Sequence, residues 1–288
     1  SMGVVEKKGE TEFVDRFYLH GDTIMHQRTT FRMSRYLSGD ELKAFLRIVG
    51  AYVAEGCLTD DKPRVVILNK DTEWLREIGE LAKKYFNVSY TISCNNDVCM
   101  LVLDSAPLKK ILEHMCGRHA VNKRLPDFVL RLRREYLEVL LRDMVKGDGY
   151  TEKRRNRPVS KEWLEKYFRY TTVSRKLASQ LCFILTRLGI KYSIWYDTRR
   201  SDEKREKVAY TIAVTTKYWR DSNTKVVVED VTSGDEYVYD IEVEGTHMFV
   251  DGIGLVALHN TLIYIIPPTA GNPIYATYVP APDTKVLV

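Results

Sequence analysis

Two acidic residues, each followed at once by glycine, close two apolar segments of the chain that are predicted to be helical. Glu55 precedes Gly56, and Asp148 precedes Gly149. A carboxylate at the C-terminal end of a helix faces the negative end of the helix dipole, so it needs a stabilising partner such as a bound cation. Glycine at the next position favours a left-handed helix stop. The pattern therefore predicts two acid-bearing helix ends, each suited to a cation.

Small residues occupy one face of each of these helices. Gly50 and Ala54 lie four residues apart in the first helix, and Gly147 lies in the second. Residues at this spacing share a helix face, and small side chains let two helix backbones approach closely. The two helices are therefore predicted to be packing elements.

The elements that lead into and follow the first helix also carry local signals. Residues 11–33 alternate apolar and polar positions and predict strands. Ser38 and Glu41 fit a capping box in which Ser38 is the N-cap and Glu41 reaches back to its backbone. Residues 64–68 predict a strand, and the runs at 88–93 and 98–104 flank the turn residues 95–97, which indicates a β-hairpin.

A weak internal repeat relates two parts of the chain. Residues 75–92 align without a gap on residues 177–194, so that Asn87 falls on Gly189. Both of these residue types suit the left-handed position after a helix. The repeat predicts a pseudo-twofold arrangement within one chain.

Together, the paired helix ends and the repeat resemble the LAGLIDADG homing endonucleases. The resemblance implies an α+β fold with two pseudo-symmetric αββαββ(α) repeats that pack through two central helices. It also implies that Glu55 and Asp148 are catalytic residues and ligands of Mg²⁺ or Mn²⁺, since such ions take carboxylates, waters and phosphate oxygens. The alternative is that both are ordinary solvent-facing acids at helix ends.

The same resemblance implies basic residues around the metal. Lys123, within the segment 122–126, is the candidate for stabilising charge near the cleaved phosphate, and Lys217 is its counterpart in the second repeat. A solvated loop lysine is the alternative for Lys123. Asp143 departs from the family, which places a small residue on this packing face, and this puts close helix contact in doubt.

Basic residues are also concentrated near hairpin tips and insertions, where they could contact nucleic acid. Arginine and lysine on two-stranded ribbons can read guanine in the major groove or bind phosphate, although charge runs are often only solvated surface. The predicted DNA-binding residues are Arg64, Lys153, Arg154, Arg155, Arg157, Arg199, Arg200, Lys204 and Arg205. Residues 38–220 would thus bind a long, asymmetric double-stranded DNA target, and we expect a monomer.

The end of the chain carries a second pattern. His247 lies in a predicted β-rich run, and His259, Asn260 and Thr261 follow after a short interval. An asparagine amide can attack its own carbonyl and break the following peptide bond, while histidines transfer protons and a hydroxyl accepts the acyl group. The run resembles the C-terminal splicing motifs of inteins. The resemblance implies that His247, His259, Asn260 and Thr261 are catalytic in protein splicing.

The N-terminal splicing motifs are not found in residues 1–40, where Ser1 is taken as a cloning remnant. We therefore expect the chain to need a separate N-terminal intein fragment, as in a split intein. The alternative function is trans splicing with an inactive or merely DNA-binding endonuclease. The predicted organisation is N-terminal strands that could belong to the splicing domain (1–37), LAGLIDADG repeat 1 (38–130), LAGLIDADG repeat 2 (131–220), an all-β Hint-type splicing part (221–260), and a C-extein segment (261–288).

The composition fits a nucleic-acid-binding globular protein. The 288 residues have a net charge of +5, which permits DNA as a partner. No apolar run approaches the roughly 20 residues of a membrane span, so we expect no membrane partner and an intracellular, cytoplasmic protein. Five scattered cysteines argue against a disulfide framework. A zinc site from Cys94, Cys99, His114, Cys116 and His119 is conceivable, although two cross-strand thiols and a buried cysteine are favoured.

Overall fold

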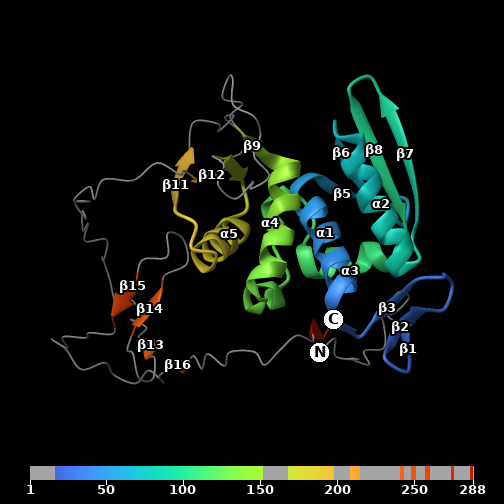
Figure 1. Cartoon of the computed structure of the whole chain (residues 1–288), viewed down its shortest axis with the longest axis horizontal. Coiled ribbons are helices and arrows are strands. Elements are labelled where there is room, and N and C mark those ends of the chain that lie inside the picture. The colour runs from blue at the N-terminus through green and yellow to red at the C-terminus, as the bar shows by residue number, and fades with distance from the viewer. Residues whose placement is uncertain are drawn as a thin grey trace.

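Two helices lie side by side at the centre of the molecule (Figure 1). The computed structural model describes residues 17–151, 168–197 and 208–214, and short strands at 241–242, 248–250, 257–259, 274–275 and 286–287. The central helices are α1 (Gly39–Glu55) and α4 (Arg134–Asp148). Both end at the acids where the sequence predicts an end. In the part of the chain described, no helix is long and apolar enough to cross a membrane.

Each central helix leads directly into an antiparallel four-stranded sheet. The first sheet has the order β5-β6-β8-β7 and the second has the order β9-β10-β12-β11. The first set of strands is β5 (Gly56–Leu58), β6 (Arg64–Asn69), β7 (Ser89–Asn95) and β8 (Val98–Asp104). The second set is β9 (Gly149–Thr151), β10 (Phe168–Thr172), β11 (Tyr192–Asp197) and β12 (Ala209–Val214).

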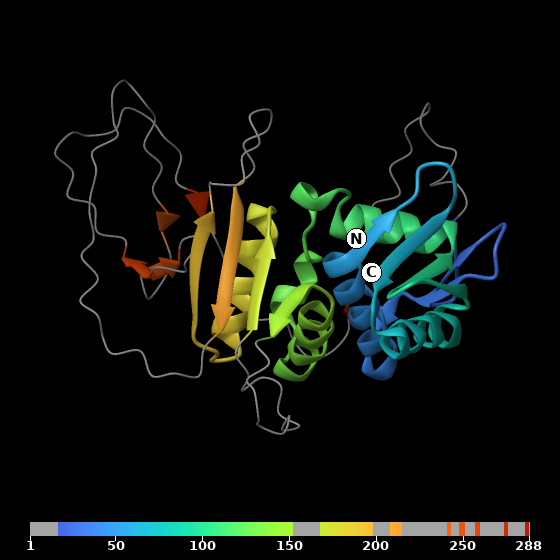
Figure 2. The same cartoon turned by 90° about the horizontal axis from the view of Figure 1, so that it is seen from above.

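One helix within each repeat lies between its second and third strands. These helices are α2 (Thr72–Phe86) and α5 (Arg175–Arg187). The two repeats thus share one element order and one sheet topology, which confirms the predicted αββαββ pattern. Seen from above, the sheets lie on opposite sides of α1 and α4 (Figure 2).

The remaining described elements precede α1, follow β8, or lie in the last part of the chain. A three-stranded meander of β1 (Phe17–His20), β2 (Thr23–His26) and β3 (Arg32–Ser34) precedes β4 (Tyr36–Leu37) and α1. After β8 come α3 (Ala106–Cys116) and the short helices η2 (Ala120–Asn122) and η3 (Asp127–Arg131). The later strands are β13 (Ile241–Glu242), β14 (Met248–Val250), β15 (Ala257–His259), β16 (Ile274–Tyr275) and β17 (Val286–Leu287).

The structure confirms the predicted left-handed positions after two helices and contradicts the predicted capping box of α1. Asn87 and Gly189 have left-handed φ angles of 52° and 69°, as the repeat alignment predicts. The capping box is wrong, because Glu41 accepts a hydrogen bond from the backbone N–H of Ser34 at 2.9 Å instead. Ser38 is still the N-cap residue of α1, but its side chain makes no capping hydrogen bond.

The glycines after the acids serve a different purpose from the predicted left-handed stop. Gly56 and Gly149 are extended, with φ of −82° and −81°, because the chain passes straight from helix into strand. A Cβ on Gly56 would lie 2.6 Å from the backbone of Tyr52, and one on Gly149 would lie 2.3 Å from the carbonyl oxygen of Val145. Glycine is therefore needed at both positions for close approach to the preceding helical turn.

The two central helices are in close contact. A Cβ added to Gly50 would lie 3.1 Å from the Cβ of Asp143, and one added to Gly147 would lie 2.6 Å from the Cβ of Ala54. The doubt raised by Asp143 is therefore wrong, because the missing side chain of Gly50 makes room for it.

Asp143 is almost fully buried and accepts hydrogen bonds from two other helices. Its carboxylate accepts from Arg47 at 3.0 and 3.2 Å and from the indole N–H of Trp74 at 2.6 Å. Arg47 also bonds Glu77 at 2.7 Å. Asp143, at a position where the family has a small residue, thus links α4 to α1 and α2 through charge-assisted hydrogen bonds.

The structure confirms one of the cysteine predictions and contradicts another. Cys94 and Cys99 face each other across the β7–β8 hairpin, as expected, but they form a disulfide, so the prediction of free thiols is wrong for this pair. Cys116 is buried, as expected. Among the described residues no group of three or more His, Cys, Asp or Glu side chains could hold a metal, so the conceivable zinc site is not formed there.

Replacing Asp143 should destabilise the fold strongly. In Asp143→Ala the Trp74 N–H loses its acceptor and Arg47 loses one of its two carboxylate partners, and we expect the free energy of unfolding to fall by about 3 kcal/mol. Urea denaturation followed by circular dichroism measures it. The surface pair Arg134–Glu138 provides a control, since Glu138→Ala should cost less than about 1 kcal/mol. Equal losses for the two variants would contradict the assigned role of Asp143.

Candidate active site

The structure brings the two predicted acids together at the adjoining ends of α1 and α4. A Cβ on Gly147, the residue before Asp148, would lie 3.2 Å from the Cγ of Glu55. Partial burial raises the pKa of Glu55, and the nearby carboxylate of Asp148 raises it further. Asp148 keeps solvent access, yet the atoms packed around its carboxyl group reduce its hydration and raise its pKa, while Lys123 opposes this with a smaller lowering effect.

Lys123 lies at the end of α1, beside the acids. Its ammonium group donates to the carbonyl oxygens of Tyr52 at 2.5 Å and Gly56 at 2.8 Å, and it lies 3.4 Å from the centre of the Tyr52 ring. Only 7% of Lys123 is exposed, so the solvated-loop alternative is wrong. Burial lowers the pKa of Lys123 to about 8, partly offset by the electrostatic effects of Cys116, Cys57 and Asp148.

The segment that carries Lys123 is held by the second repeat. Ser174, the N-cap of α5, donates to the carbonyl oxygen of Lys123 at 2.6 Å. Gln180 makes a pair of hydrogen bonds to the backbone of Leu125, at 2.8 and 2.9 Å. Lys123 therefore reaches the helix end of one repeat from a loop fastened to the other. The roles of Ser174 and Gln180 could not be predicted, because the burial of a polar side chain leaves no signal in a single sequence.

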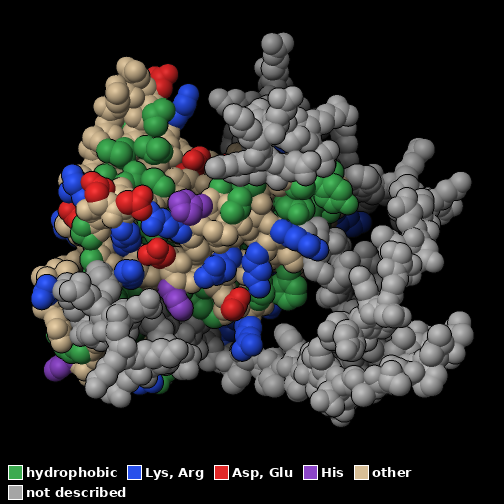
Figure 3. Space-filling view, turned by 180° about the vertical axis from the view of Figure 1, so that it is seen from behind, with side chains coloured by type: hydrophobic (Ala, Val, Ile, Leu, Met, Phe, Trp, Pro, Cys, Tyr) green, Lys and Arg blue, Asp and Glu red, His purple; other side chains and the backbone are tan. Residues whose placement is uncertain are grey.

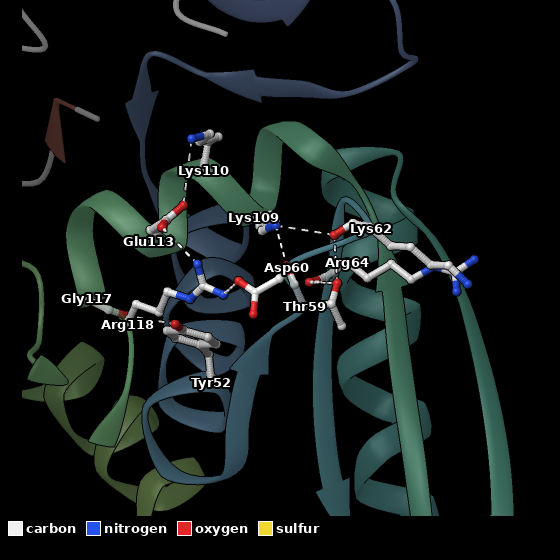
Figure 4. A network of polar contacts seen from close by, with 10 residues as sticks. All are labelled: Tyr52, Thr59, Asp60, Lys62, Arg64, Lys109, Lys110, Glu113, Gly117 and Arg118. Atoms are coloured by element: carbon white, nitrogen blue, oxygen red, sulfur yellow. Dashed lines mark hydrogen bonds and ion pairs between the residues drawn. The ribbon is translucent and has the colours of Figure 1, made fainter. Parts of the chain in front are cut away.

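Polar contacts between α3 and the β5–β6 loop surround the same helix end (Figure 4). The hydroxyl of Tyr52 donates to the carbonyl oxygen of Gly117 at 2.7 Å. Arg118 forms an ion pair with Asp60, and Lys109 donates to the carbonyl oxygen of Thr59. These contacts fix the last turn of α1, and with it the position of Glu55.

Tyr170 on β10 is a further polar group near the acids that sequence analysis did not identify. Its side chain is fully buried, and its hydroxyl has no hydrogen-bond partner in the part of the chain that the structure describes. Burial raises the pKa of Tyr170 well above its ordinary value, and the carboxylates of Asp148 and Glu55 raise it further. The hydroxyl therefore lies within electrostatic range of both acids and stays protonated.

These groups fit a hard divalent cation. Mg²⁺ in proteins takes one or two carboxylates and completes its shell with waters and substrate phosphates. Glu55 and Asp148 provide two carboxylates whose mutual repulsion and partial dehydration a cation would relieve. The unpaired hydroxyl of Tyr170 can bond a water in such a shell.

Only one of the predicted DNA-binding residues lies in a described range. Arg64 begins β6 and forms an ion pair with Asp104 on β8 at 3.4 Å. Its neighbour Val65 faces the core, so Arg64 belongs to the opposite face of the first sheet. Figure 3 shows Lys and Arg side chains among fewer acidic ones on the side of the molecule turned away from the viewer in Figure 1.

Many predicted site residues lie outside the described residues. These are Lys153, Arg154, Arg155, Arg157, Arg199, Arg200, Lys204, Arg205, Lys217, His247, Asn260 and Thr261. His259 ends β15, and the register pairs it with Met248 on β14, the residue after His247.

Comparisons with known proteins show a similarity in the second repeat. Residues 135–237 match the model of the LAGLIDADG-like domain. This range begins in α4 and runs through the second sheet. The second repeat is therefore similar to a LAGLIDADG-like domain, and the first repeat has the same element order.

The curated relatives are much longer than this chain. A DNA polymerase of Thermococcus sp. is 30% identical over 177 residues, which cover 49% of this chain and 10% of that protein. A DNA polymerase of Thermococcus litoralis is 25% identical over 80% of this chain and 16% of its own length. The ATP-dependent DNA helicase Hel308 of Thermococcus kodakarensis is 27% identical over 69% of this chain and 17% of its own length. The chain thus spans between a tenth and a fifth of these relatives.

Solved structures with a similar arrangement include I-DmoI in complex with DNA and Mn. That chain has a TM-score of 0.44 and 15% sequence identity, over 61% of this chain and 90% of its own. The N-terminal LAGLIDADG domain of WhiA has a TM-score of 0.39 and 11% identity, over 61% of this chain and 77% of its own.

The shifted pKa of Lys123 predicts a measurable pH dependence of stability. The folded state holds the Lys123 proton less tightly than the unfolded state, so the penalty is complete below pH 8 and is relieved as the pH rises from about 8 towards 10.5. From pH 7 to pH 10 the wild type should gain about 2–3 kcal/mol of unfolding free energy relative to Lys123→Met. Urea denaturation at both pH values measures this difference.

A surface variant separates this effect from the titration of other lysines. Lys43 lies near the start of α1 with 42% of its side chain exposed, and it forms an ion pair with Asp40 at 3.7 Å. We therefore expect Lys43→Met to follow the wild type at both pH values. If the unfolding free energy of Lys123→Met also changed with pH as that of the wild type does, the charged ammonium of Lys123 would not be destabilised by burial.

Proposed function

We propose that this chain is a site-specific double-strand DNA endonuclease that depends on Mg²⁺ or Mn²⁺. The observation that carries the proposal is the meeting of Glu55 and Asp148, one from each repeat, at the ends of two closely packed helices. The match of residues 135–237 to the LAGLIDADG-like domain supports it. A two-repeat body with different side chains in each half suits a long, asymmetric duplex bound by a monomer.

The acids and the lysines would have different roles in phosphodiester hydrolysis. Glu55 and Asp148 would hold the metal, which when bound polarises the phosphate and makes a bound water more acidic. Lys123 places a positive charge beside the acids, and its fixed hydrogen bonds to α1 keep it there. Such preorganised charge stabilises developing negative charge on the phosphate. Lys217 is proposed to act likewise in the second repeat.

Arginine and lysine residues on the sheets and their hairpin tips would bind the duplex. Arg64 lies on the face of the first sheet away from the core. The basic residues proposed to act with it are Lys153, Arg154, Arg155, Arg157, Arg199, Arg200, Lys204 and Arg205. Two-stranded ribbons fit the major groove, where such side chains bind phosphates and base edges.

We further propose that the endonuclease is carried by the C-terminal portion of a protein-splicing element. The pairing of His259 with Met248 supports this, because it places the residue that follows His247 in the sequence opposite His259. The relatives support it as well. A polymerase and a helicase share this segment over less than a fifth of their lengths, as expected for an element inserted into unrelated hosts.

DNA cleavage should require both acids. We expect the wild type with Mg²⁺ to cut a subset of a randomised duplex library, and Glu55→Gln and Asp148→Asn each to reduce the rate by at least about 10³-fold. Both variants should still bind the selected duplex, which gel-shift assays measure. Sequencing of the cut ends measures cleavage.

Lys43→Met is a matched control for this experiment, since Lys43 lies near the start of α1, at the opposite end of the helix from Glu55, and 42% of its side chain is exposed. It should cut like the wild type. If the wild type binds a duplex and leaves it intact under these conditions, the nuclease assignment is wrong. The alternative, a splicing element with a domain that only binds DNA, would then stand.

Asparagine cyclisation should cut the chain after Asn260. The Asn260 side-chain nitrogen attacks its own carbonyl carbon, the Asn260–Thr261 bond breaks, and the released Thr261 amine takes up a proton. Mass spectrometry of the warmed chain should show a slow release of residues 261–288. Asn260→Ala should abolish it, and His259→Ala should slow it about 10²-fold. Release at an equal rate from Asn260→Ala would contradict this chemistry.

A further inference from the structure

A buried hydroxyl without a hydrogen-bond partner is uncommon in a native protein and needs an explanation. Tyr170 has such a hydroxyl, and its whole side chain is 0% exposed. Two arginines also have an unpaired Nε, but Arg64 and Arg118 form ion pairs through their terminal nitrogens. Tyr170 is different because its single polar atom is the unpaired one.

The strand register places Tyr170 next to the acids. On β10 it pairs with Gly149 of β9, the residue that follows Asp148. The carboxylates of Asp148 and Glu55 both act on its hydroxyl electrostatically. The hydroxyl is therefore a fully buried polar group within electrostatic range of both acids.

The first repeat shows that packing alone does not require a polar group here. Gly56, which follows Glu55, pairs with Ile67 of β6 in the same register. Ile67 is also 0% exposed, so an apolar side chain fills the equivalent place. The hydroxyl of Tyr170 is therefore a feature of the second repeat alone.

We propose that the hydroxyl of Tyr170 donates a hydrogen bond to a water molecule that lies between the carboxylates of Glu55 and Asp148 and completes the shell of the bound cation. Tyr170 is then a positioning residue, since it acts through this water. The inference rests on the proposed function, because it assumes that the acids bind a cation. Groups that orient metal ligands in this way commonly raise metal affinity.

Titration with Mn²⁺ in the absence of DNA tests the inference. We expect Tyr170→Phe to bind Mn²⁺ about three- to tenfold more weakly than the wild type in calorimetry, the loss expected for one hydrogen bond. In cleavage assays, the Mn²⁺ concentration for half-maximal rate should rise by the same factor, with the rate at saturation unchanged. Thermal melting in EDTA should show a cooperative transition for both proteins.

Two variants separate the possible outcomes. Tyr210 lies on the neighbouring strand β12 and stacks edge-on against Tyr196, so Tyr210→Phe should bind Mn²⁺ like the wild type. Glu55→Gln should lose most of the binding. If Glu55→Gln loses binding while Tyr170→Phe matches the wild type, this inference is overturned and the proposed function stands. If the wild type itself binds no Mn²⁺, both are overturned.

Discussion

The close contact of α1 and α4 is the constraint on which the rest of the structure depends. Glycine at positions 50 and 147 lets each helix receive the side chain of its partner, Asp143 on one side and Ala54 on the other. Because both helices end in acids, the distance between the helix axes also sets the distance between Glu55 and Asp148. Any side chain larger than hydrogen at these glycines would push the acids apart. Glycine at these positions therefore serves both the packing of the two helices and the close approach of the two acids.

Two neighbouring carboxylates at helix ends are electrostatically unfavourable, and a lysine from a loop outside the two central helices stabilises them. Two carboxylates at helix C-termini are opposed both by each other and by the helix dipoles. Lys123 offsets this unfavourable charge at the end of α1. Its ammonium group donates hydrogen bonds to the carbonyl oxygens of Tyr52 and Gly56, and it adds positive charge near Asp148. Its loop is fastened to α5 through Ser174 and Gln180. The second repeat thus stabilises the acid-bearing end of the first central helix.

Sequence patterns predicted the features that repeat along the chain and missed those that depend on its folding. Both central helices, their acid ends and the left-handed positions at Asn87 and Gly189 follow from local signals. The partner of Asp143 could not be predicted, because a buried acid is acceptable only once Arg47 and Trp74 are brought to it. Tyr170 was missed for the same reason, since an alternating strand gives no sign of which tyrosine lacks a partner.

The two repeats share a backbone frame and differ in the side chains that complete it. Gly56 pairs with Ile67, whereas Gly149 pairs with Tyr170, and Gly50 of one helix faces Asp143 of the other. A symmetric frame fixes where two scissile phosphates would lie, while unequal side chains give each position its own polarity. Each half contributes one acid, but Tyr170 belongs to the second half alone. The polarity on the two sides of the acid pair is therefore expected to differ even though the helices that present the acids are equivalent.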